Sequence, residues 1–119
     1  MRSMMLSVAA VLAMALPAGA QDPLKVDPAH HKLEFENDQV RVIRVTIPAG
    51  DKTLVHEHPN SVGVYLRDTQ SRLSPVGGKV TETTRKAGDV LELKAVKHVI
   101  ENIGSTTAEI IMVELKGSR

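Results

Sequence analysis

Three histidines carry the residue types and spacing that bind metal ions. His56 and His58 are separated by one residue, and His98 opens a later apolar segment. In an extended strand, residues two apart point to the same face, about 6.6 Å apart at ~3.3 Å per residue. Two imidazoles so placed can converge on one ion at Zn–N distances of ~2.0–2.1 Å. If the segment of His98 lies across from them, the pattern predicts a three-histidine metal site. The alternative is that these are half-buried strand residues without a metal.

The other two histidines, His30 and His31, are adjacent in a polar segment. Neighbours in an extended chain point in opposite directions, so both cannot easily serve one metal. We therefore expect them to be solvated surface histidines.

Composition excludes several classes of function. Of 119 residues, 42% are apolar, which supports one domain. The net charge is +1, with no basic excess for nucleic acid, and only Phe35 and Tyr65 are aromatic. The sequence has no Cys, so thiolate sites and disulfides are excluded. No glycine-rich phosphate loop is present. We expect no nucleic-acid partner and no nucleotide cofactor.

The first twenty residues have the pattern of a signal peptide. Arg2 precedes an apolar run from Leu6 to Leu16, and the segment ends in Ala18-Gly19-Ala20. The alternative, a membrane anchor, would need a longer apolar run to cross ~30 Å of hydrocarbon. Cleavage after Ala20 removes 20 of the 119 residues and leaves 99, with 14 basic and 14 acidic side chains. We expect a periplasmic or secreted protein whose mature form does not associate with a membrane.

The mature chain reads as many short strands without helical periodicity. Alternating and β-branched runs are bounded by turn signals such as Pro48-Ala49-Gly50-Asp51 and Gly77-Gly78. This pattern predicts an all-β, antiparallel sandwich or barrel. We expect a signal peptide at 1–20, an N-terminal arm at 21–39, a barrel domain at 40–116 and a tail at 117–119. The expected strands cover residues 33–36, 40–47, 52–57, 62–66, 72–76, 79–84, 90–93, 98–103 and 108–115.

The spacing around the histidines resembles the motifs of the cupin superfamily. Gly50, five residues and His56-x-His58 match the start of G-x5-H-x-H-x(3,4)-E-x6-G. Gly88-Asp89, His98 and Asn102 partly match the second motif, G-x5-P-x-G-x2-H-x3-N. The opening E-N-D-x-V-R-V at 36–42 is similar to that of small exported single-domain cupins, of the cupin-2-like β-barrel type. The resemblance implies an antiparallel jelly-roll β-barrel. It also implies that His56, His58 and His98 line the barrel mouth as metal ligands.

The chain departs from the family pattern at the fourth ligand. Val62 and Gly63 stand where the family has a metal-binding Glu, and Lys94 and Val96 replace the Pro and second Gly of the second motif. Three neutral imidazoles leave a divalent site at 2+ and favour Fe²⁺, Zn²⁺, Cu²⁺ or Ni²⁺ over carboxylate-seeking ions. Such a site should attract an anion, such as a substrate carboxylate or enolate. Some cupins use three histidines and iron for oxygenation.

Other polar residues give weaker signals. Tyr65 is interpreted as a surface or interface aromatic, and Asn102 as a residue holding a turn. Arg41 and Arg44 would either bind an anionic ligand or lie exposed on a strand. Ser61 lies near His58, but nothing resembles a nucleophile elbow, and no catalytic residue is identified.

Three functions fit the sequence. The first is an exported cupin that binds a divalent metal and acts on a small molecule as an oxygenase- or isomerase-like enzyme. The second is a non-catalytic module that binds a small, anionic ligand. The third is a structural module that forms a homodimer.

Overall fold

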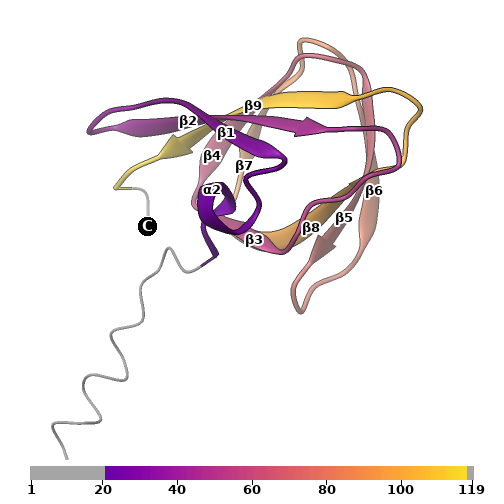
Figure 1. The fold of residues 1–119 in the computed structure, drawn as a ribbon, viewed down its shortest axis with the longest axis horizontal. Helices are drawn as coiled ribbons and strands as arrows, with labels where there is room; N and C mark the ends of the chain where they lie inside the picture. The colour runs from indigo at the N-terminus through magenta and orange to yellow at the C-terminus, as the bar shows by residue number, and fades with distance from the viewer. Residues whose placement is uncertain (1–20, 118–119) are drawn as a thin grey trace, which may run out of the picture.

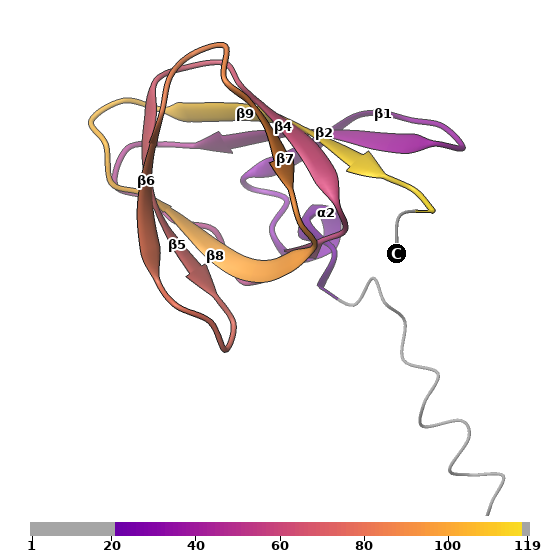
Figure 2. The ribbon, with the colours of Figure 1, turned by 180° about the vertical axis from the view of Figure 1, so that it is seen from behind.

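The computed structural model describes residues 21–117, which form two antiparallel β-sheets facing each other (Figure 1 and Figure 2). In Figure 1, β2 and β9 pass over one side of the barrel, and β3 and β8 lie on the opposite side. The predicted all-β, antiparallel architecture is confirmed. The five-stranded sheet comprises β1 (His31–Glu36), β2 (Val40–Ile47), β9 (Ala108–Leu115), β4 (Ser61–Tyr65) and β7 (Val90–Leu93), in that order. The four-stranded sheet comprises β3 (His56–His58), β8 (Val96–Asn102), β5 (Thr69–Pro75) and β6 (Thr81–Arg85).

The core lies between the paired strands β2 and β9 and the opposite sheet. Ile43, Val45 and Ile47 were predicted to share one face of β2, and all three are at most 2% exposed. They pack with Ala108, Ile110 and Met112 of β9. The two strands pair in register over their whole length, from Val40–Leu115 to Ile47–Ala108. This apolar surface forms one inner wall of the barrel.

The N-terminal arm is more ordered than the sequence suggested. A one-turn helix, α2 (Pro23–Val26), follows Asp22, whose carboxylate accepts a hydrogen bond from the Leu24 backbone N–H at 3.0 Å. A proline in the first turn and an acidic N-cap are both favourable there. β1 begins at His31, two residues earlier than predicted, and pairs with β2. The arm is therefore continuous with the five-stranded sheet.

The segment leading to the His-x-His pair is mostly loop. The expected strand at 52–57 is wrong in its first half, since regular pairing begins only at His56 and Lys52 makes an isolated bridge to Glu101. The loop starts at the predicted turn, where Gly50 has a φ of 81°, a value that favours glycine. Thr53 then takes part in the hydrogen bonding in place of a regular ladder, because its side chain accepts the Ile100 backbone N–H at 3.0 Å.

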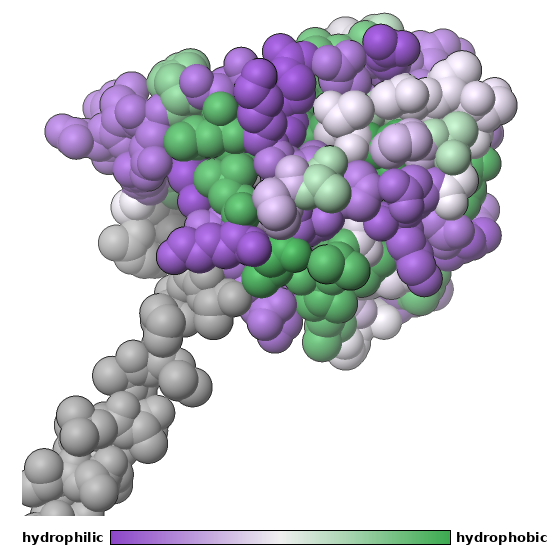
Figure 3. Space-filling model, in the orientation of Figure 1, coloured by the Kyte–Doolittle hydropathy of each residue, from purple (hydrophilic) through white to green (hydrophobic). Residues whose placement is uncertain are grey.

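The face of the molecule seen in Figure 3 is largely polar, with apolar patches between the polar side chains. Leu33 and Phe35 of β1 are 41% and 55% exposed. Within residues 21–117, no helix has the length and apolar character needed to cross a bilayer. The predicted signal peptide at 1–20 lies outside the described residues, and the tail is described only at Gly117.

Candidate metal centre

β3 places the His-x-His pair on the inner face of the barrel. His56 and His58 are 0% and 2% exposed, whereas Glu57 between them points to solvent. β3 pairs with β8 so that His56 lies directly opposite His98. The ring centroids are 4.7 Å apart for His56–His58, 4.8 Å for His56–His98 and 5.6 Å for His58–His98. The structure therefore makes the three rings neighbours, but the histidines whose ring nitrogens come close enough together to share an ion include His56 and His58 and not His98.

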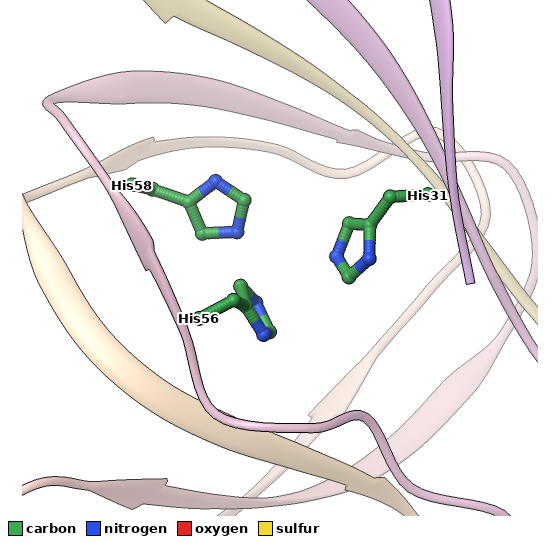
Figure 4. Close-up of side chains that lie close together, drawn as sticks. All are labelled: His31, His56 and His58. Carbon is green, nitrogen blue, oxygen red and sulfur yellow. The ribbon is translucent and has the colours of Figure 1, made fainter. Parts of the chain in front are cut away.

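A fourth histidine, His31, joins this cluster from the other sheet. It is 4% exposed, and its ring centroid lies 4.6 Å from that of His56. One ring nitrogen from each of His31, His56 and His58 lies within 4.8 Å of the others (Figure 4). The interpretation of His30 and His31 as solvated is wrong. His31 points into the barrel, and His30 is held between Asp27 and Asp51 at 2.9 and 2.8 Å.

Hydrogen bonds fix the orientation of three of these rings. The Nδ1 atoms lie 3.0 Å from the Asp27 carbonyl oxygen (His31), 2.8 Å from the Leu54 carbonyl oxygen (His56) and 2.6 Å from Oε2 of Glu114 (His58). Carbonyl and carboxylate oxygens only accept hydrogen bonds, so each Nδ1 carries the proton. In a neutral ring the lone pair is then on Nε2, and a metal-binding histidine commonly donates its other ring N–H in this way.

Several Nε2 atoms of the cluster are buried without a partner. This holds for His31, His56 and His98. A buried polar atom that makes no hydrogen bond costs free energy, of the order of 1–3 kcal/mol. Unpartnered imidazole nitrogens on neighbouring rings are a suitable donor set for a transition metal ion. The residues therefore fit the divalent metal that the cupin resemblance implies.

Burial keeps these rings neutral. It is the largest cause of the lowered pKa values of His56, about 4, and His98, about 3. The charge of neighbouring histidines lowers both further. Burial also lowers the pKa of His31. Near pH 7 these three rings are thus in the unprotonated form that a metal requires.

Sequence reasoning missed Glu114, which lies against His58. It is 3% exposed and follows Ala108, Ile110 and Met112 on the inner face of β9. An acidic residue that continues the apolar face of a strand was the signal that could have identified it. Its carboxylate contacts Nδ1 of His58 and so fixes the orientation of that ring, leaving Nε2 on the other side. It does not take the place of the family Glu, which would bind the metal directly.

Residues that cannot bind a metal occupy the position at which the cupin motif has its metal-binding Glu. Val62 is half-buried, and Gly63 faces the barrel interior beside Leu93 and Met112. A Cβ on Gly63 would lie 2.8 Å from the Leu93 Cδ1 atom, so even an alanine would require Leu93 to move. A larger side chain at this point would therefore need Leu93 to change its conformation.

An apolar cavity of about 220 Å³ adjoins His58 and His98. Its walls come from both sheets, and no acidic side chain lines it. The remaining lining residues are Ser61, Leu73, Pro75, Thr81, Leu93, Lys94, Val96 and Met112.

The remaining polar residues have structural roles. Arg41 and Arg44, the two arginines considered as anion ligands from the sequence, bind carboxylates of the protein itself. Arg41 contacts Asp22 and Glu114, and Arg44 contacts Glu34 and Glu109.

Asn102 holds the turn, as expected. Its side chain donates to the Ile47 and Thr106 carbonyl oxygens and accepts the Gly104 backbone N–H. The surface interpretation of Tyr65 is wrong, because it packs against the core.

Comparison with known proteins identifies the architecture. Neither a protein-family profile nor a curated protein sequence matches the chain. Among solved structures, a cupin domain from Bordetella pertussis is 21% identical, covers 73% of this chain and 92% of its own, and has a TM-score of 0.67. An RmlC-like cupin with a double-stranded β-helix fold from Methanocaldococcus jannaschii is 18% identical (71% and 77% covered, TM-score 0.57). A cupin 2 conserved barrel domain protein from Salinispora arenicola is 15% identical (87% and 91% covered, TM-score 0.58). This chain therefore has the cupin fold, the antiparallel jelly-roll barrel predicted from its sequence.

Proposed function

We propose that this protein binds one divalent transition metal ion in its histidine cluster and holds a small anionic ligand beside it. The observation that carries the proposal is the set of buried Nε2 atoms of His31, His56 and His98 that have no partner. With His58, they offer only imidazole donors. Such donors favour Fe²⁺, Zn²⁺, Cu²⁺ or Ni²⁺.

The cavity beside His58 and His98 supports a ligand with an apolar body. An apolar cavity of about 150 Å³ is large enough for benzene. The cavity here is about 220 Å³, so it suits a single ring or a short branched chain that carries one small polar group. Neutral imidazoles leave the charge of a divalent ion uncompensated, and Lys94 lies at the cavity wall. A carboxylate or enolate would meet both requirements.

The residues of the chain would have distinct tasks in such a complex. When bound, the metal would supply Lewis acidity and an open coordination position. The imidazoles would hold it in place through Nε2, because three of the Nδ1 atoms are already engaged. Leu73, Leu93 and Met112 would exclude water from the ligand's apolar body. An oxygenase- or isomerase-like reaction is the catalytic form of this proposal.

Elemental analysis of the untagged mature protein tests metal binding. After reconstitution with Fe²⁺, Zn²⁺, Cu²⁺ or Ni²⁺, we expect close to one equivalent of at least one of these ions. The double variant His56→Ala/His58→Ala should retain less than a tenth of an equivalent. The control Glu109→Gln, which changes a carboxylate outside the cluster, should bind like the wild type. Less than a tenth of an equivalent of every ion in the wild type would refute the proposal.

Calorimetry with benzoate as the probe separates a metal-anchored ligand from simple binding by the barrel. In the metal-anchored case, His56→Ala should weaken benzoate binding strongly. An unchanged affinity would favour the non-catalytic binding module. The third function, a homodimer, is supported by the exposed Leu33 and Phe35 on the edge strand β1. A strictly monomeric species in sedimentation at high concentration would exclude it.

The proposal also places the mature protein in the periplasm or outside the cell. The support is the signal-peptide pattern of residues 1–20, with cleavage after Ala20. Mass spectrometry of the exported protein should find Gln21 as the N-terminal residue. An intact Met1 on the exported protein would contradict this.

A further inference from the structure

The N-terminal arm is connected to the histidine cluster by two chains of hydrogen bonds. One begins at Asp22, before helix α2, and the other at Asp27, directly after it. The cupin motifs of the sequence include neither residue. Each chain of hydrogen bonds ends at a ring of the cluster.

Glu114 is the charged anchor of the cluster. Its Oε2 accepts the Nδ1–H of His58 at 2.6 Å, and its Oε1 accepts from the Arg41 Nε at 3.0 Å. The carboxylate is almost fully buried, with 4% of its side chain exposed. A buried carboxylate without a positive partner would be strongly destabilising. Arg41 is the positive partner of the Glu114 carboxylate that contacts His58.

Arg41 is itself fixed by the arm. Its two terminal nitrogens donate to both carboxylate oxygens of Asp22, at 2.8 and 2.9 Å. These hydrogen bonds raise the pKa of the Arg41 guanidinium. Such a two-point contact sets the plane of the guanidinium as well as its position. The first chain therefore runs from Asp22 through Arg41 and Glu114 to His58.

The second chain of hydrogen bonds supports the rings of His31 and His56 through Asp27. The backbone carbonyl of Asp27 accepts the Nδ1–H of His31 at 3.0 Å. Its carboxylate accepts the Leu54 backbone N–H at 3.2 Å, and the Leu54 carbonyl in turn accepts the Nδ1–H of His56. The Asp27 side chain is 3% exposed, so these bonds are shielded from water.

We propose that residues 22–31 are a working part of the metal centre, and that Glu114, held by Arg41 and Asp22, is a positioning residue that presents Nε2 of His58 to the ion. The inference rests on the proposed function. A carboxylate behind a metal-binding histidine raises the ring's basicity and fixes its tautomer. Removing such a partner typically lowers metal affinity 10- to 100-fold.

The first test is Glu114→Gln, which keeps the size of the side chain and removes its charge. We expect the Zn²⁺ dissociation constant, measured by competition with a chelator, to rise at least tenfold. The control is Glu109→Gln, the same change on the same strand, at a carboxylate that also binds arginines but lies outside the site. The control should remain within twofold of wild type. A change below twofold in Glu114→Gln would overturn the proposal.

The second test is Asp22→Asn, which leaves the direct Glu114–His58 contact in place. Asn is as good an N-cap as Asp, so helix α2 keeps its cap. An amide has a single acceptor oxygen, so one of the two hydrogen bonds from Arg41 is lost and the other no longer ends on a charged acceptor. We therefore expect the Zn²⁺ dissociation constant to rise roughly threefold. This variant tests the hydrogen bonds that lead from Asp22 through Arg41 and Glu114 to His58, even if Glu114→Gln fails to fold. Wild-type affinity in Asp22→Asn would remove the arm from the proposal.

A readout without metal distinguishes positioning from a loss of stability. In the ¹⁵N spectrum of the metal-free wild type, we expect His58 to be protonated on Nδ1 alone. In Glu114→Gln the ring should divide between its two tautomers, whereas in Glu109→Gln it should not. A wild-type ring protonated on Nε2 would overturn the inference. If the wild type bound no metal yet showed the expected tautomer, the proposed function would fail while the assignment of Glu114 to His58 would stand.

Discussion

Acidification should destabilise the metal-free protein well above the range where carboxylates titrate. An unfolded histidine has a pKa of about 6.5. Burial lowers the pKa of His56 to about 4 and that of His98 to about 3 in the folded protein. Between these values and 6.5, the unfolded chain binds more protons than the folded chain. The stability contributed by the neutral rings is therefore complete above pH 6.5 and is lost as the pH falls.

The size of the effect follows from proton linkage. At pH 5 both folded rings remain neutral, while their unfolded counterparts are almost fully protonated. Each ring then costs about 2 kcal/mol relative to pH 7, and the pair costs about 4 kcal/mol. His31, whose pKa burial also lowers, acts in the same direction. His30 acts in the opposite one, because hydrogen bonds to Asp51 and Asp27 outweigh its burial and raise its pKa. The total free energy of unfolding of a small domain is only about 5–15 kcal/mol.

Urea unfolding in the presence of a chelator, at pH 7, 6 and 5, measures this loss. We expect the free energy of unfolding to fall by about 4 kcal/mol with little change in the denaturant slope. His98→Gln removes one of the two rings that contribute most of this loss, so the loss should be about half as large. A loss below about 1 kcal/mol in the wild type would refute the reasoning. So would an equal loss in His98→Gln.

Two further predictions concern the scaffold. Asn102→Ala removes three hydrogen bonds at a buried turn and should lower the free energy of unfolding by about 3 kcal/mol in urea titrations. A loss below about 1 kcal/mol would contradict the role given to this side chain. Ile43→Ala, at a position that is 0% exposed, should cost about 2–5 kcal/mol by the same measurement. Its control, Val90→Ala at a 62% exposed position, should change stability by less than about 0.5 kcal/mol, and equal losses at the two sites would be inconsistent with the core described here.

Local patterns were sufficient to predict the fold and part of the site. The period-two alternation of Ile43, Val45 and Ile47 identified the inner face of β2, because in a strand this alternation is set by backbone geometry. The same geometry placed His56 and His58 on one side of β3. The loop before them was mistaken for strand, since Thr53 meets the neighbouring strand β8 through its side chain as well as its backbone, and sequence does not distinguish the two.

His31 and Glu114 could not be assigned a role from sequence alone. Alternation within β1 puts His31 on the same side as Leu33, yet Leu33 is 41% exposed and His31 is buried. A bulge between Leu33 and Phe35 then shifts the register for the rest of the strand. Within β1 only His31, the first residue, is buried in the barrel. Which residue of β1 is buried depends on how far the strand extends beyond the opposite sheet, and this cannot be read from the sequence. Glu114 occupies an inward position that normally holds an apolar residue. Its place makes sense only with Arg41 and His58 beside it, and these come from distant parts of the chain.

The histidine cluster joins the two sheets, because His31 belongs to one and His56 to the other. An ion shared by these two rings would close a loop of 25 residues in a chain that has no cysteine. A covalent cross-link around a loop of that length is worth about 3–4 kcal/mol by restricting the unfolded chain. A bound metal would act as a reversible counterpart of a disulfide. The resistance of the domain to unfolding and proteolysis would then rise and fall with the free metal concentration around it.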